Sequence, residues 1–228
     1  MKIGLQFAME SELHALPGAK ELEPFVTISG VPFFEIAPDM IACAGGISKV
    51  NAAMAAEIFC LHFGVDMIIN AGVAGCATDL PTGSLVVASE FVQHDVDTTA
   101  IGDEVGLVST VNCLTFPTWE PEHCREILKE LGYETVLGRV ATGDWFATGC
   151  ARSEWIRDTF HPLLLEMEGC AIAQVCLRNR VPFVAVKSVS DHLFGTANQT
   201  EEYFNFGQAL ENMGRVILPL AHKLQEER

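Results

Sequence analysis

The chain has 228 residues, of which 49% are hydrophobic and 19% are charged, and its formal net charge is −16. This length and apolar content exclude a disordered protein and suffice for a large buried core. The acidic balance excludes an extended surface for nucleic acid or anionic membrane, which needs clustered Lys and Arg. Because no apolar run reaches the roughly 18 residues of a membrane span and the N-terminus resembles a strand more than a signal peptide, we expect a cytoplasmic protein.

In the first part of the chain, buried strands alternate with helices. Residues 2–9 predict a strand, and a short helix follows that ends at Pro17 and Gly18. Segments 25–28 and 31–36 flank Ser29-Gly30 and predict a hairpin, and 40–44 predicts another strand. A long helix is expected over 48–63, closed by Gly64.

The same alternation continues to the end of the chain. We predict strands over 65–72, 84–90, 135–141, 163–167 and 183–190, and helices over 120–131, 151–160, 169–178 and 200–225. Residues 94–118 form no periodic pattern and predict a long loop. Helices between buried strands indicate one α/β domain over residues 1–228, with a largely parallel sheet and helices on both faces.

The cysteines and histidines give no sign of a metal site or a disulfide framework. The 8 cysteines form no CxxC pair and mostly lie in apolar segments, which is typical of reduced core thiols. The segment HDVD at residues 94–97 comes nearest to a metal motif, but a loop with local hydrogen bonds is the favoured interpretation. We therefore expect neither a metal nor a cofactor.

Carboxylates follow three of the predicted strands. Glu12 comes after the first strand, Glu166 and Glu168 lie where a strand meets a helix, and Asp191 ends the last strand. Taken singly, each has an ordinary role, such as capping a helix or closing a turn. Ligands of open α/β sheets, however, bind beyond the carboxyl ends of the strands. Like charges crowded there raise one another's pKa, so the set favours an acid–base site.

Seven segments occur in the order and spacing of one known family: MKIGLQFAMESE, GGISKVNAA, INAGVAG, HDVDTTAIG, TGDWF, LEMEGCAIAQVC and VKSVSD. Over nearly its whole length the chain resembles the 5′-methylthioadenosine/S-adenosylhomocysteine nucleosidases of the nucleoside phosphorylase superfamily. The resemblance implies a three-layer α/β/α sandwich with a mixed central sheet. It also implies a homodimer in methionine salvage that hydrolyses the N-glycosidic bond of methylthioadenosine, S-adenosylhomocysteine or 5′-deoxyadenosine, releasing adenine.

The resemblance further implies roles for particular residues. Glu12 would activate the attacking water, and Asp191 would protonate adenine N7; such acid catalysis contributes typically about 10²–10⁴-fold in rate. Glu168 would bind the ribose hydroxyls, Met167 would pack beneath the sugar, and Phe146 would stack on the base. The other implied substrate-binding residues are Ala147, Ile47, Gly75, Val73, Ser190, Met9 and Lys187, and Ile101 would reach toward the partner subunit.

Departures from the family pattern leave the substrate open. Val73 and Lys187 stand where these nucleosidases usually carry Ser and Arg, and lysine lacks the fork geometry of arginine. Phe7 replaces a glycine, Ala147 replaces a larger apolar residue, and Tyr203 and Phe204 are only near matches for the 5′-pocket residue of the last helix.

Three alternatives remain. One is a nucleosidase of the same fold that acts on a futalosine-type or other purine nucleoside, and another is a non-catalytic nucleoside-binding relative. A phosphorylase is disfavoured, because Asn70 and Val73 replace the Arg and Ser of a phosphate site.

Overall fold

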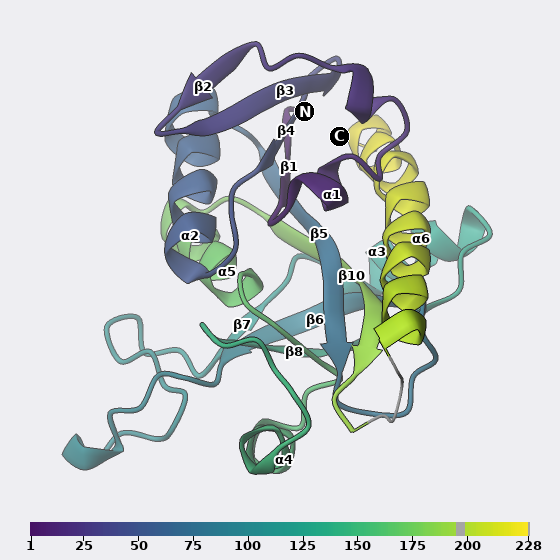
Figure 1. Ribbon diagram of the computed structural model, residues 1–228. Coiled ribbons are helices and arrows are strands. Elements are labelled where there is room, and N and C mark those ends of the chain that lie inside the picture. The colour runs from purple at the N-terminus through teal and green to yellow at the C-terminus, as the bar shows by residue number, and fades with distance from the viewer. Residues whose placement is uncertain (195–198, 228) are drawn as a thin grey trace.

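The computed structural model describes the backbone of residues 1–194 and 199–227, and the side chains of residues 1–194 and 205–227. All predicted strands and helices are present (Figure 1). The strands are β1 (Ile3–Phe7), β2 (Val26–Ile28), β3 (Val31–Ala37), β4 (Met40–Ala44), β5 (Met67–Cys76), β6 (Leu85–Gln93), β7 (Thr115–Pro117), β8 (Thr135–Thr142), β9 (Leu164–Glu166) and β10 (Phe183–His192). The α-helices are α1 (Glu10–Leu13), α2 (Lys49–Ile58), α3 (Pro121–Glu130), α4 (Ala151–Phe160), α5 (Gly169–Asn179) and α6 (Gln199–Glu226).

Short helical turns complete the described chain: η1 (Ala19–Glu21), a π-helical turn η2 (Phe59–Phe63) and η3 (Thr99–Ile101). The turn η2 extends α2 to Gly64, whose left-handed φ of 60° ends the helix as predicted. The predicted loop over 94–118 is mostly irregular but contains η3 and β7, and it projects from the body of the molecule in Figure 1.

All the strands belong to one sheet in the order β10-β6-β8-β9-β5-β1-β4-β3-β2, and β7 pairs with β6. An additional pairing between β10 and β5 closes β5, β10, β6, β8 and β9 into a ring. The sheet is mixed: β5 pairs in parallel with β1 and β10 but antiparallel with β9. The mixed sheet is the one that the resemblance implied. Parallel pairings join β4, β1, β5 and β10, as the alternation of strands and helices predicted, and the antiparallel pairings include the hairpin connections β2–β3 and β3–β4.

Helices cover both faces of the sheet, and each face has its own core. Residues of α1, α3 and α6 pack with Ile3, Leu5 and Phe7 of β1 on one face. Residues of α2 and α5 pack with Ile68 and Ala74 of β5 on the other. The alternation along each strand assigns successive side chains to opposite faces, which is the three-layer arrangement that the resemblance implied.

A β-bulge interrupts β10 next to β5. Val189 pairs with Ala74 and Asp191 pairs with Gly75, so Ser190 is an extra residue without a partner in this ladder. A bulge of this kind bends the strand and changes the direction of the following side chains.

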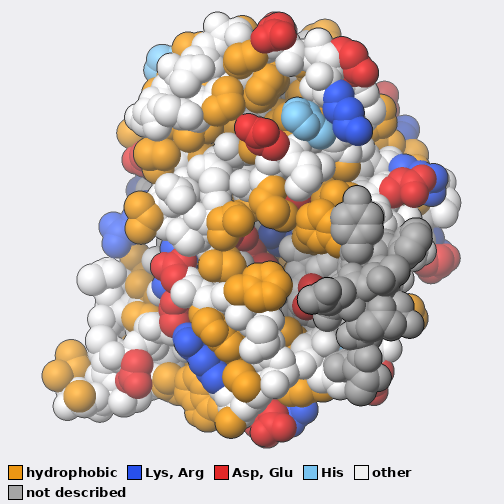
Figure 2. All heavy atoms as spheres, in the orientation of Figure 1, with side chains coloured by type: hydrophobic (Ala, Val, Ile, Leu, Met, Phe, Trp, Pro, Cys, Tyr) orange, Lys and Arg blue, Asp and Glu red, His pale blue; other side chains and the backbone are white. Residues whose placement is uncertain are grey.

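On the face seen in Figure 2, hydrophobic side chains gather near the middle, and acidic and basic side chains lie scattered around them.

None of the helices in the described chain combines the length and the apolar composition that a membrane crossing requires.

Candidate active site

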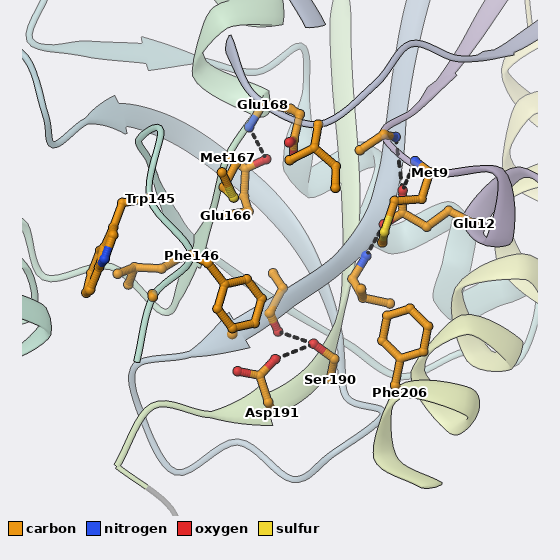
Figure 3. Close-up of a pocket in the computed structure, with 17 residues that line it drawn as sticks. Met9, Glu12, Trp145, Phe146, Glu166, Met167, Glu168, Ser190, Asp191 and Phe206 are labelled. Atoms are coloured by element: carbon orange, nitrogen blue, oxygen red, sulfur yellow. Dashed lines mark hydrogen bonds between the residues drawn. The ribbon is translucent and has the colours of Figure 1, made fainter. Parts of the chain in front are cut away.

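A cavity of about 200 Å³ opens at the carboxyl ends of β1, β5 and β10, beside the junction of β9 and α5. A second hollow of about 310 Å³ adjoins it and shares Phe146, Ala147, Ser190, Asp191 and Phe206 with it. In Figure 3, Met9 and Glu12 lie on one side of the cavity, Met167 and Trp145 on the opposite side, and Ser190 and Asp191 between them. The lining residues are Ala8, Met9, Glu12, Ile47, Val73, Ala74, Gly75, Trp145, Phe146, Ala147, Leu165, Glu166, Met167, Glu168, Ser190, Asp191 and Phe206.

Backbone amides hold the carboxylate of Glu12 in place at the start of α1. Its Oε2 accepts the N–H groups of Ala8 and Met9, each at 2.9 Å, and its Oε1 accepts the Val73 N–H at 2.9 Å. Burial raises the pKa of Glu12, against the opposing effects of the Lys187 charge and these amides. The result is a fixed, desolvated carboxylate, which suits a general base.

Gly72 makes room for this carboxylate. A Cβ atom at Gly72 would lie 2.5 Å from Glu12 Oε1, well inside van der Waals contact. The strand that was predicted over 65–72 continues as β5 to Cys76, so that Gly72 and Gly75 both lie within it. Its small residues therefore let two acidic side chains approach the backbone, since a Cβ at Gly75 would likewise lie 3.1 Å from Asp191 Oδ2.

Glu166 and Glu168 bind different partners, although they are only two residues apart. The Oε2 atom of Glu166 accepts the N–H groups of Glu168 at 3.1 Å and Gly169 at 2.8 Å, so Glu166 caps α5. The Oε1 atom of Glu168 instead reaches across the cavity wall and accepts the Ser48 N–H, at the start of α2, at 2.8 Å. Burial and the neighbouring Glu166 charge raise the pKa of Glu168 to about 7.

Lys187 lies behind the cavity wall. Its ammonium is 3.1 Å from Glu166 Oε2, its side chain is 3% exposed, and it is not among the residues that line the cavity. Burial alone would lower the pKa of Lys187, but the charges of Glu166, Glu168 and Glu12 raise it above its usual value. The predicted substrate-binding role of Lys187 therefore has no direct contact with the cavity to support it.

Asp191 reaches the cavity because of the bulge at Ser190. The Ser190 hydroxyl lies 2.6 Å from Asp191 Oδ1 and 3.2 Å from the Ala74 carbonyl oxygen, and both Ser190 and Asp191 line the cavity. Without the extra residue, two successive side chains of β10 would point to opposite faces of the sheet. The hydroxyl and the carboxyl group thus form a hydrogen-bonded pair on one wall.

Aromatic and aliphatic side chains surround the cavity opening. Phe146 is 72% exposed and Ile47 is 48% exposed, and Trp145 packs beneath the Arg152 guanidinium, which lies 4.5 Å from the ring centroid. Phe206 of α6 also lines the cavity (Figure 3). The predicted candidates Tyr203 and Phe204 lie outside the residues whose side chains the structure describes.

The HDVD segment forms the local hydrogen bonds of the favoured interpretation at Asp97, but Asp95 binds residues distant in sequence. Lys49 Nζ lies 2.6 and 2.7 Å from the two carboxylate oxygens of Asp95, and Asp95 Oδ2 accepts the Asp144 N–H at 2.8 Å. Asp97 accepts hydrogen bonds from the backbone and the hydroxyl of Thr99. Across the described residues, no group of three or more His, Cys, Asp or Glu side chains is placed to hold a metal ion.

The cavity contains every predicted site residue except Lys187: Glu12, Asp191, Glu168, Met167, Phe146, Ala147, Ile47, Gly75, Val73, Ser190 and Met9. Glu166, which the sequence analysis grouped with the other acids at this edge of the sheet, lines it as well. The cavity also contains lining residues that the sequence analysis did not assign to it: Ala8, Ala74, Trp145, Leu165 and Phe206. Most of these are chain neighbours of assigned residues, a signal that was available. Phe206 lies far from any motif, and only the packing of α6 places it here.

Known proteins resemble this chain in sequence and in structure. The family model of the Phosphorylase superfamily matches residues 2–222. The 5′-methylthioadenosine/S-adenosylhomocysteine nucleosidase of Geobacillus sp. (strain WCH70) is 35% identical over 236 aligned positions, which cover 99% of this chain and 100% of the relative.

Among solved structures, the nucleosidase of that name from Colwellia psychrerythraea 34H, in complex with adenine, has a TM-score of 0.85 and 32% identity over 96% of this chain and 94% of that chain. The futalosine hydrolase of Helicobacter pylori strain 26695 has a TM-score of 0.89 and 26% identity over 98% of both chains.

The fold and the acid-lined cavity thus define a member of the phosphorylase superfamily. Within it, the chain belongs to the family of 5′-methylthioadenosine/S-adenosylhomocysteine nucleosidases. The expected family and fold class are confirmed.

Proposed function

We propose that this protein hydrolyses the N-glycosidic bond of a 5′-modified adenosine and releases adenine, and that the cavity is its active site. Family membership supports a hydrolase that acts on purine nucleosides. The observation that carries the assignment to this cavity is the meeting of Glu12, Glu168 and Asp191, which come from three distant stretches of the chain, around one space. Cleavage of the bond leaves positive charge on the ribose and negative charge on the base, and both need acidic groups close by.

In the proposed mechanism, Glu12 binds and deprotonates the attacking water. A carboxylate oxygen accepts about two hydrogen bonds, and Oε2 already accepts two backbone N–H groups. Oε1, which accepts the Val73 N–H, keeps a position for water. The water therefore attacks C1′ from the side of β5, and Glu12 also stabilises the oxocarbenium-like ribose.

Asp191 is the proposed general acid at adenine N7. The Ser190 hydroxyl, 2.6 Å from Oδ1, orients the carboxyl group toward the cavity. Phe146 would stack on the base, and Ala147 would lie beside its edge. Glu168, which the Ser48 amide holds on the opposite wall, would bind the ribose hydroxyls above Met167.

Apolar side chains line the remaining part of the cavity and suit a thioether or alkyl group at the 5′ position. Met9, Ile47, Val73 and Phe206 supply this lining. None of these four side chains carries a charge that could pair with the amino-acid group of S-adenosylhomocysteine, so we propose methylthioadenosine as the preferred substrate over S-adenosylhomocysteine. A role in methionine salvage in the cytoplasm would follow.

We also propose that residues 1–228 form one nucleosidase domain, which the family match over residues 2–222 supports. A homodimer is proposed from the projecting segment around Ile101, whose side chain is 80% exposed. Analytical ultracentrifugation tests this assembly directly.

The function is tested by adenine release from a nucleoside panel, each compound with and without phosphate. The panel holds methylthioadenosine, S-adenosylhomocysteine, 5′-deoxyadenosine, adenosine, inosine and an aminofutalosine. We expect phosphate-independent release, fastest from methylthioadenosine. Strict dependence on phosphate would instead indicate a phosphorylase, and binding without release would indicate a nucleoside-binding relative.

A further inference from the structure

One side of the cavity, which we call the polar wall, is formed by Glu12, Glu166 and Glu168, with Lys187 behind them. This wall has more negative than positive groups. Glu12, Glu166 and Glu168 are all buried, at 2%, 8% and 7% exposure. Among the residues whose side chains are described, Lys187 is the one buried lysine or arginine, at 2% exposure. Because like charges repel strongly in a desolvated site, a single ammonium must compensate three carboxylates.

Lys187 of β10 and the first turn of α5 bind the same atom, Oε2 of Glu166. Its Nζ lies 3.1 Å from Glu166 Oε2, the same atom that accepts the N–H groups of Glu168 and Gly169. The Thr142 hydroxyl of β8 donates to the other oxygen of Glu166. The backbone of Glu168, and with it the position of its carboxylate, therefore depends on the contact between Lys187 and Glu166.

The charge of Lys187 also acts on the two carboxylates that face the cavity. It lowers the pKa of Glu12 and of Glu168, against the effect of burial on both. The charged groups that act on Lys187 are Glu12 from α1, Glu166 from β9 and Glu168 at the start of α5, and together they raise its pKa. The nearby Cys170 thiol stays neutral, because burial raises its pKa to about 12.

We propose that Lys187 is a positioning residue for the reaction, which holds Glu166 against the start of α5 and supplies the one buried positive charge beside Glu12 and Glu168. It contacts no substrate and acts through these three glutamates. This inference rests on the proposed function, because only a base that must lose its proton makes the ionisation of Glu12 limiting. The acidic limb of the pH profile is the range in which kcat falls as the pH is lowered and Glu12 gains a proton. Loss of the ammonium then moves this limb to higher pH.

Three variants separate this role from simple packing. K187M/E166Q removes the ammonium together with its direct partner, so that neither member of this ion pair remains alone. In this variant the acidic limb of the pH profile of kcat should rise by about one pH unit or more, whatever the height of the plateau. E166Q alone removes a neighbouring negative charge and should move the acidic limb to lower pH. K187R keeps the charge and should keep the limb near its wild-type position.

A purely structural role of Lys187 predicts a different result, namely the same fractional loss at every pH in K187M/E166Q. An unshifted limb in that variant would therefore overturn the proposal. If the double variant does not fold, E166Q decides, since an unchanged limb there contradicts charge coupling across this wall.

A substrate-free measurement keeps this test separate from that of the proposed function. Carboxyl ¹³C NMR of glutamate-labelled protein, with the Glu12 and Glu168 signals assigned through E12Q and E168Q, gives their titration midpoints in wild type and in each variant. The Glu12 midpoint should rise in K187M/E166Q, because Lys187 lowers the pKa of Glu12. The Glu168 midpoint should fall in E166Q, because the Glu166 charge raises the pKa of Glu168. If the wild type releases adenine from no nucleoside, the proposed function fails while this titration still tests Lys187. Equal midpoints in all three proteins would overturn the role of Lys187 even in a fully active enzyme.

Discussion

The polar wall of the cavity and its apolar opening are built in opposite ways. On the wall, Glu12 and Glu168 are 2% and 7% exposed, and backbone amides from other elements fix both carboxylates. At the opening, Phe146 and Ile47 are 72% and 48% exposed and offer mainly apolar surface. Rigid, desolvated groups suit the chemistry, and exposed apolar groups suit recognition of the substrate. Substitutions in the two regions should therefore separate into effects on kcat and effects on KM.

The largest effect is expected from D191N. Asparagine keeps a hydrogen-bond donor but cannot transfer a proton to N7, so kcat should fall by roughly 10²-fold or more while KM changes little. Adenine release at saturating substrate measures the loss. S190A serves as the control, because it removes the hydroxyl 2.6 Å from Asp191 and leaves the acid itself in place. Near-full activity of D191N would remove Asp191 from the role of general acid.

E12Q should lower kcat to a similar or slightly smaller extent and leave ligand affinity within a few-fold of wild type. The amide NH₂ group must face either the Val73 N–H or the N–H groups of Ala8 and Met9, and the donors that it faces lose their acceptor. This mismatch costs about 1–3 kcal/mol in stability. Thermal melting and calorimetric binding of a non-hydrolysable nucleoside should accompany the rate measurement. Tight binding with undiminished turnover would contradict the assignment of Glu12 as the base.

At the opening, F146A should raise KM by about 10-fold with a smaller change in kcat. Stacking of an aromatic side chain on a base contributes about 1–3 kcal/mol. F146Y, which keeps the ring, is the matched control and should stay near wild type. A loss of F146A activity that appears only in kcat would mean that the ring acts on the reaction and not on binding.

The smallest effect is expected from D95N. Asp95 binds Lys49 at the start of α2 and the backbone of Asp144, and so it connects the segments that carry Ile47 and Phe146. Loss of its charge should loosen both segments and raise KM a few-fold. The control is D97N in the same segment, because Asp97 contacts only local groups of Thr99 among the bonds found here. Equal effects of D95N and D97N would argue against this connection.

Much of the fold could be predicted from the sequence because local patterns carry it. The apolar run at 40–44 and the helical segment at 151–160 coincide with β4 (Met40–Ala44) and α4 (Ala151–Phe160). The directions of the strands within the sheet were harder to predict. The strand β9 runs parallel to β8 and antiparallel to β5, and no local sequence pattern encodes such a pairing.

The candidate site likewise has parts that the sequence predicts and parts that depend on contacts between distant segments. Motifs identified the acids, but the bulge at Ser190 depends on the register between β10 and β5. The position of Lys187 also depends on a partner distant in sequence, since Glu166 is 21 residues away along the chain. A resemblance between sequences implied a substrate contact for this lysine, and the three-dimensional arrangement places it behind the wall instead.

Two adjacent residues of β5 face very different constraints on mutation. Any replacement of Gly72 adds a Cβ that would lie 2.5 Å from Glu12 Oε1, so saturation mutagenesis should tolerate almost nothing there. The next residue, Val73, holds Glu12 with its backbone N–H and exposes its side chain to the cavity. Because that hydrogen bond does not depend on the side chain, selection can exchange residue 73 freely without disturbing the base. The strand β5 thus has a position that cannot change, Gly72, directly beside one that can, Val73. Substitution at residue 73 is a route by which descendants of this protein could acquire new substrates.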